Sequence, residues 1–69
     1  MSKSENAHID LKKLRNEKGW TQKKSAQELG FARPYVSDVE TGKRGISMKM
    51  MQQIIKVFGV KYEDFFESH

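Results

Sequence analysis

Four cations flank a short polar stretch in the middle of the chain, and their spacing favours the binding of phosphate. Lys23 and Lys24 lie in the first turn of one expected helix, and Lys43 and Arg44 follow the end of the next. A cation in a first turn opposes the helix dipole, at a cost of about 0.3 to 1 kcal/mol. A phosphate at that helix end would reverse the effect, because the free N–H groups and both lysines would attract it. The other interpretation is that Lys23 and Lys24 are ordinary solvated side chains.

The distribution of charge supports the same interpretation. The chain has a formal net charge of +4 at pH 7. Residues 1–44 hold ten Lys and Arg against six Asp and Glu, whereas residues 45–69 hold three against three. A basic face of this kind favours a polyanion as partner. Nucleic acid is a better candidate than a membrane surface, since the sequence contains no basic amphipathic helix with an aromatic face.

Residue types and spacings argue against several other kinds of chemistry. The chain has no cysteine, and its two histidines, His8 and His69, stand near opposite ends, so we expect no metal site. No nucleophile and base occur at a recognisable spacing, and we therefore expect no catalytic residues and no enzyme activity. No motif indicates a cofactor or a small-molecule ligand.

Length and hydropathy predict a single cytoplasmic domain. Sixty-nine residues leave no room for a second domain, so we expect residues 1–69 to form one unit in which residues 1–6 are flexible. No apolar run approaches the roughly 20 residues of a membrane span, and the N-terminus lacks the apolar core of a signal peptide. We therefore expect a cytoplasmic protein without membrane association.

Two helices joined by a tight turn would present the polar stretch. Thr21 can cap the first helix, Ala26 and Leu29 share its apolar face, and Gly30 is placed to end it. Only about two residues then separate it from the next helix, which is too short a link for antiparallel packing. The helices must therefore cross steeply, with a small residue such as Ala26 at their contact. This geometry predicts a helix-turn-helix.

The first helix of the chain is predicted over residues 7–18. Asn6 or Ser4 could cap it, and Gly19 is placed to end it. Trp20 follows directly and should fold back onto the helix end, because a large apolar side chain there avoids water.

The helix after the tight turn should run from Arg33 or Pro34 to Thr41, since proline is accepted in a first turn. Ser47 is placed to cap a further helix over residues 48–58. A short last helix that continues the core would complete an all-α, five-helix fold.

The chain resembles the DNA-binding domains of the lambda-type repressor and Cro family. The resemblance runs from Leu11 to Phe66 through the blocks LKKLRNEKGWTQ, SAQELGF, PYVSDVETGKR and SMKMMQQIIKVFGVKYEDFF, whose order and spacing make it specific. The chain departs from the family pattern at four positions, with Ser25 in place of a leucine, Ala32 and Lys61 in place of polar caps, and Pro34 in a first turn. The resemblance implies a five-helix, lambda-repressor-like helix-turn-helix domain that binds duplex DNA.

The outward face of the second helix of the motif would read base edges, because the N-terminal part of that helix enters the major groove. The candidate base contacts are Arg33, Pro34, Tyr35, Ser37 and Asp38. Arg33 suits guanine, Asp38 can accept from cytosine, and Pro34 can meet a thymine methyl group, while Ser37 or Tyr35 could reach a base or a phosphate. Asp38 could instead neutralise Arg33 or Arg44, and Tyr35 could pack against the protein.

Phosphate contacts are expected around this face, from Gln22, Lys23, Lys24, Thr41, Lys43 and Arg44. The resemblance implies that the loop after the recognition helix grips the DNA backbone. It also implies that Gln22 contacts a phosphate or braces the side chains that read the bases.

Arg15 and Glu40 are expected to form a structural ion pair. Arg15 lies beside core positions of the first helix and Glu40 beside those of the recognition helix, so their faces should meet. In the resembling family an arginine and a glutamate at these two positions pair in this way. Breaking such a pair from one side is expected to cost about 3 kcal/mol or more if it is well buried. A direct contact with DNA is the alternative.

Apolar residues on the helix over residues 48–58 occupy more than one face. Met48, Met51, Ile55 and Phe58 form a stripe at helical spacing, which we interpret as core, with Ile54 at its margin. A helix that is apolar on two faces needs two partners.

Three apolar side chains are left outside this expected core. Met50 and Val57 lie on the other side of the stripe, and Phe66 follows Tyr62 and Phe65, which continue the core. A surface patch of this kind is typical of a subunit interface. The resembling family generally dimerises through its last helices, so we expect Met50, Val57 and Phe66 to form a homodimer interface.

The sequence therefore predicts a transcriptional regulator that binds duplex DNA as a homodimer on an inverted-repeat operator. It would act as a repressor, or as an activator at some sites. The alternative is an antitoxin-like or anti-repressor protein whose helix-turn-helix mainly contacts another protein. The cationic rim around a polar outward face argues against that alternative.

Overall fold

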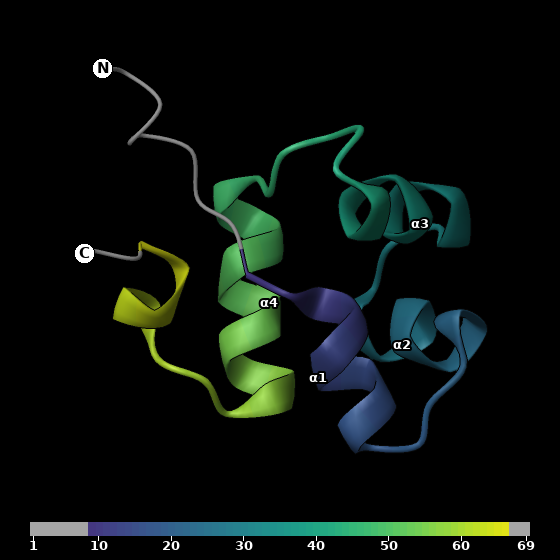
Figure 1. The fold of residues 1–69 in the computed structure, drawn as a ribbon, viewed down its shortest axis with the longest axis horizontal. Coiled ribbons are helices and arrows are strands. Elements are labelled where there is room, and N and C mark those ends of the chain that lie inside the picture. The colour runs from purple at the N-terminus through teal and green to yellow at the C-terminus, as the bar shows by residue number, and fades with distance from the viewer. Residues whose placement is uncertain (1–8, 67–69) are drawn as a thin grey trace.

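Four α-helices make up most of the fold in the computed structural model, which describes residues 9–66 (Figure 1). In chain order the elements are α1 (Leu11–Glu17), α2 (Gln22–Leu29), α3 (Arg33–Thr41), α4 (Met48–Phe58) and the 3-10 helix η2 (Tyr62–Phe65). These described residues contain no strand, so the fold is all-α over this range. A fifth α-helix is not seen within residues 9–66, and its expected place is taken by the four-residue η2. The flexibility expected of residues 1–6 concerns a segment outside the described residues.

Helix α4 stands between η2 on one side and the pair α2 and α3 on the other (Figure 1). Helix α2 packs against both α3 and α4, and α1 packs against α3. Every element contributes buried apolar side chains to one core: Leu11, Ala26, Leu29, Val36, Val39, Met50, Met51, Ile54 and Phe65. Trp20 packs against the C-terminal end of α4, with its ring centroid 5.5 Å from that of Phe58.

Local signals set the ends of α2 and α4. The Thr21 hydroxyl accepts a hydrogen bond from Lys24 N at 3.1 Å, and the Ser47 hydroxyl accepts one from Met50 N at 3.1 Å. Each satisfies a backbone N–H group that has no partner inside its helix. The predicted helix over residues 48–58 is confirmed in both bounds.

Helix α3 begins at Arg33, so Pro34 is its second residue rather than its first. Ala32 precedes the helix in an extended conformation and forms no side-chain cap, since alanine has no acceptor. Proline is tolerated at this second position because the N–H group that it lacks would have no intrahelical partner.

Helix α1 is shorter than the sequence predicts. The sequence predicts a start near residue 7, but the helix begins at Leu11 and residues 9 and 10 lie outside it. The reason is Asp10, whose carboxylate accepts a hydrogen bond from Lys13 N at 3.1 Å and so caps the helix there. The candidate caps Ser4 and Asn6 lie outside the described residues.

The buried face of α4 also differs from the predicted stripe. Met50 is 0% exposed and packs in the core beside Met51 and Ile54, whereas Met48 is 59% exposed. The assignment of Met50 to a dimer interface is therefore wrong. Tyr62, expected in the core, is 56% exposed. A helix that is apolar around much of its circumference does not specify by its period which strip faces inward.

Candidate nucleic-acid interface

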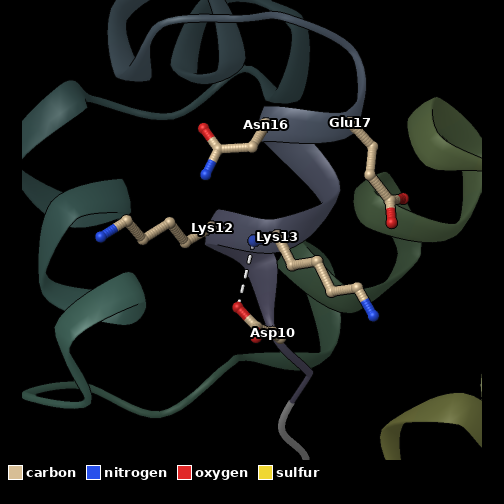
Figure 2. A pocket seen from close by; sticks show the side chains of 5 residues that line it. All are labelled: Asp10, Lys12, Lys13, Asn16 and Glu17. Atoms are coloured by element: carbon tan, nitrogen blue, oxygen red, sulfur yellow. Dashed lines mark hydrogen bonds between the residues drawn. The ribbon is translucent and has the colours of Figure 1, made fainter.

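One open hollow on the surface lies along α1, and its charges are mixed. Asp10, Lys12, Lys13, Asn16 and Glu17 line it. The two lysine side chains point in different directions, with Lys12 on the side of α3 (Figure 2). Two carboxylates and two ammonium groups around one hollow give no preference for an anion, so this surface is a weak candidate for phosphate.

A second hollow lies where α2 meets the outer face of α3. Its lining residues are Gln22, Arg33, Pro34 and Ser37. Arg33 and Pro34 are exposed, and Gln22 and Ser37 are half-buried. The structure thus brings a guanidinium, an apolar ring, a hydroxyl and an amide to one place. These groups match the donors, acceptors and methyl groups at the edges of base pairs.

The turn between α2 and α3 fixes this arrangement. Gly30 adopts a left-handed conformation with φ 80°, which ends α2, and its N–H group donates to the carbonyl of Ala26 at 2.9 Å. Phe31 N donates to the same carbonyl at 3.1 Å. The chain then enters α3 with Val36 and Val39 in the core. The opposite face of α3 is therefore left to the solvent side.

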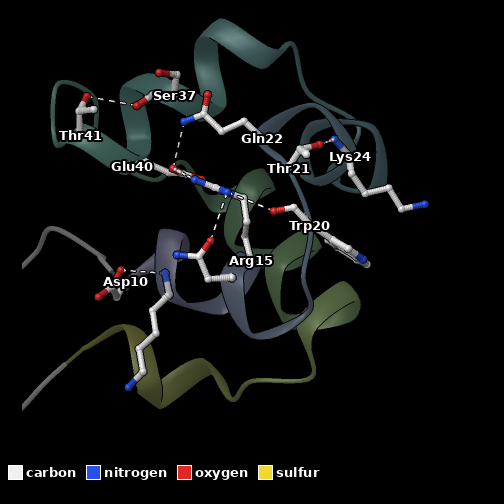
Figure 3. A network of polar contacts seen from close by, with 11 residues as sticks. Asp10, Arg15, Trp20, Thr21, Gln22, Lys24, Ser37, Glu40 and Thr41 are labelled. Atoms are coloured by element: carbon white, nitrogen blue, oxygen red, sulfur yellow. Dashed lines mark hydrogen bonds and ion pairs between the residues drawn. The ribbon is translucent and has the colours of Figure 1, made fainter.

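A polar network ties α3 to α1 and α2 (Figure 3). Arg15 Nε and Nη2 donate to Glu40 Oε2 and Oε1 at 2.7 and 3.0 Å, which forms a bidentate ion pair. Gln22 Nε2 donates to Glu40 Oε1 at 3.0 Å, and Arg15 Nη1 donates to the carbonyl of Trp20 at 3.1 Å. The side chains of Arg15 and Glu40 are 13% and 2% exposed. Glu40 therefore both anchors α3 and holds Gln22 beside the second hollow.

The surroundings of Glu40 act on its pKa in two directions. Burial raises the pKa, whereas hydrogen bonds from Arg15 and Gln22, together with the charges of Arg15 and Lys12, lower it. The lowering effects are larger in sum, so the pKa of Glu40 lies below its ordinary value. The hydrogen bond to Glu40 also raises the pKa of Arg15. Both groups of the pair therefore remain charged at neutral pH.

Tyr35 makes its contacts with the protein rather than standing free on the outer face. Its ring meets that of Phe31 edge-on, with centroids 5.0 Å apart. The guanidinium carbon of Arg44 lies 4.8 Å from the Tyr35 ring centroid, and the Tyr35 hydroxyl donates to Ser47 Oγ at 3.3 Å. These contacts favour the packing interpretation of Tyr35.

Asp38 is half-buried on α3, and its backbone carbonyl accepts from Lys43 N at 2.9 Å and Arg44 N at 3.3 Å. The ion pairs within residues 9–66 join Arg15 to Glu40 and Lys24 to Glu28. Asp38 therefore does not pair with Arg33 or Arg44 in this part of the chain. Its carboxylate stays available for another donor.

The side chains expected to contact phosphate differ in how far they are already engaged. Those that are exposed are Lys23, Lys24, Thr41, Lys43 and Arg44. Lys24 Nζ forms an ion pair with Glu28 Oε2 at 3.1 Å and lies 5.8 Å from the Trp20 ring centroid. The Thr41 hydroxyl donates to the backbone carbonyl of Ser37 at 3.1 Å. A phosphate would compete with these contacts at Lys24 and Thr41.

Lys12 is a residue to which sequence reasoning assigned no role. It is exposed on α1, and its charge is one of the influences that lower the pKa of Glu40. The signal in the sequence is its spacing of three residues from Arg15, which places both side chains on one side of a helix. That spacing alone does not show which residue of α3 the pair would face.

Residues 9–66 offer neither a membrane-spanning helix nor a metal-binding cluster. None of the helices within residues 9–66 is both long and apolar enough to cross a membrane. The same residues contain no cluster of three or more side chains that could hold a metal ion. His8 and His69 lie outside the described residues.

Comparison with known proteins gives a consistent result. Residues 11–65, from the start of α1 to the end of η2, match a family model described as helix-turn-helix. The chain is 44% identical over 46 residues to an uncharacterized helix-turn-helix-type transcriptional regulator of Methanocaldococcus jannaschii, covering 67% of this chain and 70% of that protein. It is 36% identical over 47 residues to the control protein C.BamHI of Bacillus amyloliquefaciens, covering 68% of this chain and 58% of that protein. No solved structure matches the chain significantly.

Proposed function

The chain belongs to the helix-turn-helix transcriptional regulators of the lambda-repressor and Cro type, and we therefore propose that it binds specific sequences of duplex DNA through α3. The observation that carries this proposal is the grouping of Arg33, Pro34 and Ser37 on the outer face of α3, with Gln22 beside them. The proposed role is binding without catalysis. The proposed location is the cytoplasm, where the protein would meet its DNA.

Side chains on α3 would read the base edges. Arg33 would donate two hydrogen bonds to a guanine, and Asp38 would accept one from a cytosine. Pro34 would contact a thymine methyl group, and Ser37 would reach a base or a phosphate. The exposure of Arg33 and Pro34 supports these roles.

The DNA backbone would be held on both sides of α3. Lys23 at the start of α2 and Lys43 and Arg44 after α3 are exposed cations suited to phosphate. Gln22 would donate to a phosphate with its second Nε2 N–H group, since the first donates to Glu40, which is not among the side chains expected to read bases. Lys24 and Thr41 would contribute less, since each already has a partner within the protein.

We also propose that the protein acts as a homodimer on an inverted repeat, as a repressor or, at some sites, an activator. One recognition helix reads too few base pairs to single out a genomic site. A two-fold dimer would place two such helices about one DNA turn, roughly 34 Å, apart. Val57 and Phe66 are half-buried and remain the proposed interface. The exposed ring of Tyr62, with its centroid 5.1 Å from that of Phe66, adds apolar surface beside Phe66.

A gel-shift titration at several salt concentrations tests DNA binding. Several phosphate contacts should make the affinity for duplex DNA fall strongly between about 50 and 200 mM salt. Changing Lys43 and Arg44 together to Glu should weaken binding to all sequences alike. The control is the same double reversal at Lys56 and Lys61, exposed cations outside α2 and α3, which should retain binding. Because these residues flank Val57 and Tyr62 of the proposed interface, sedimentation equilibrium must first show that the control variant keeps its oligomeric state.

Affinity that does not change over this salt range would contradict the proposed phosphate contacts. A complete lack of binding to duplex at low salt would favour the antitoxin-like or anti-repressor alternative, in which the helix-turn-helix contacts a protein. If the protein does bind duplex DNA, selection of bound sites from random DNA would identify the operator and show whether it is an inverted repeat.

A further inference from the structure

Tyr35 joins three segments of the protein at the edge of the recognition surface. Its ring lies against Phe31 of the tight turn on one side and beneath the guanidinium of Arg44 on another, at 5.0 and 4.8 Å. Its hydroxyl donates to Ser47, which caps α4. The ring is half-buried and its contacts come from before and after α3, so its position is well defined.

The backbone of the loop after α3 is also fixed. Gly42 ends α3 in a left-handed conformation with φ 83°, and the next two N–H groups, of Lys43 and Arg44, both donate to the carbonyl of Asp38. This is the hydrogen-bonding pattern that closes a helix end. The main chain of Arg44 is therefore held by α3, and its side chain is held by the ring of Tyr35.

We infer that Tyr35 is a positioning residue that holds the Arg44 guanidinium in place for a DNA phosphate, and that it does not itself read a base. The inference rests on the proposed function and deepens it. A guanidinium that lies face-on over a ring leaves its N–H groups at the edge for two oxygens of one phosphate.

The stacked position also reduces the cost of binding. A free arginine side chain loses rotamer freedom when it grips a phosphate, whereas a stacked one has lost part of it beforehand. Lys43 lies next to Arg44 in the same loop, and the ring contacts of cations within residues 9–66 involve Lys18, Lys24 and Arg44 but not Lys43. The two neighbouring cations should therefore depend on Tyr35 to different degrees.

The test is a set of duplex affinities at one salt concentration, on the strongest site selected from random DNA. Tyr35→Leu should weaken binding about two- to fivefold, the size of an exposed cation–π contact. Tyr35→Phe keeps the ring and should bind nearly as well as the wild type. In an Arg44→Ala background, Tyr35→Leu should cause no further loss. In a Lys43→Ala background it should cause its full loss, which makes Lys43 the matched control.

The stacking is also measured without DNA. In the wild-type protein, the side-chain protons of Arg44 should show a ring-current shift in the NMR spectrum, and Tyr35→Leu should abolish it. The spectrum of the wild type alone tests the geometry, so this test remains possible even if Tyr35→Leu does not fold. Absence of the shift in the wild type would overturn the inference.

Two further outcomes separate this inference from the proposed function. If the wild type binds DNA but the losses from Tyr35→Leu and Arg44→Ala multiply, Tyr35 acts independently of Arg44 and only the inference fails. A changed base preference in Tyr35→Leu would likewise make Tyr35 a base contact. If the wild type binds no duplex DNA, the proposed function fails, and with it the role given to Arg44.

Discussion

Replacing Glu40 by alanine should be the most damaging single change in the polar network. Glu40 accepts three hydrogen bonds, at 2.7 and 3.0 Å from Arg15 and at 3.0 Å from Gln22, and its side chain is 2% exposed. Breaking a buried pair from one side costs about 3 to 5 kcal/mol, because the remaining charge is left without a partner. Arg15 keeps its bond to the carbonyl of Trp20 and is 13% exposed, so we expect the lower end, about 3 kcal/mol.

A loss of this size is large for a domain of 69 residues. Domains of this length have total stabilities of about 3 to 10 kcal/mol. The melting temperature should fall by about 12 to 24 °C, at roughly 4 to 8 °C for each kcal/mol. Circular dichroism during thermal and urea unfolding at pH 7 measures both quantities. Glu40→Gln is the matched control, since it keeps the size of the side chain and one acceptor and should lose less stability.

The same pair predicts how stability depends on pH. The pKa of Glu40 is lower in the folded state than its ordinary value, so the carboxylate contributes stability that is fully present above the unfolded pKa. That contribution is lost as the pH falls through the lowered, folded pKa. The stability difference between wild type and Glu40→Gln should therefore be constant above about pH 5 and shrink below about pH 4.

A Glu40→Ala protein within about 0.5 kcal/mol of wild type would refute the scaffold role, since surface changes alone produce effects of that size.

Three other predictions address the core, the base contacts and the dimer. Ser25 is 0% exposed and its hydroxyl has no hydrogen-bond partner within residues 9–66, so Ser25→Ala should raise the stability by about 1 kcal/mol. A lower melting temperature in that variant would show that the hydroxyl is satisfied. Arg33→Ala should cost about 1 to 3 kcal/mol on the preferred site and relax the choice at one base pair, and an equal loss on random DNA would make Arg33 a phosphate contact. Phe66→Asp should shift the protein toward monomer while the monomer stays helical, as sedimentation equilibrium and circular dichroism would show. A variant that stays dimeric at micromolar concentration, or that unfolds, would exclude Phe66 from the interface.

Four helix ends after residue 20 follow from the sequence because their signals are local. Thr21 and Ser47 cap α2 and α4 as their residue types predict, and Gly30 and Gly42 end helices with φ 80° and 83°. A left-handed residue is inexpensive only for glycine, so its position marks a helix end whatever the tertiary structure is. The start of α1 does not follow in this way, because several polar residues near it could act as the cap and only the structure shows that Asp10 does.

The membership of the candidate site was accessible from the sequence, but the contacts of its members were not. The spacing of α2 and α3 indicates which face of α3 is free, and Arg33 and Ser37 lie on that face. It does not indicate that the Tyr35 ring lies against Arg44, or that Lys24 is paired with Glu28. These contacts depend on the rotamers of the side chains and on how the loop after α3 folds back toward that helix.

The order of the helices, most of their ends and the outward face of the recognition helix follow from the sequence, since these depend on neighbours within about one helical turn. Tertiary structure alone decided which side of α4 is buried. Met50 is enclosed and Met48 exposed, although both are methionines two positions apart on a helix that is apolar on several sides. Only packing against the other helices distinguishes them. The hydrophobic effect depends on the apolar area removed from water, so burial would favour either methionine equally, and the neighbouring helices decide which one is covered.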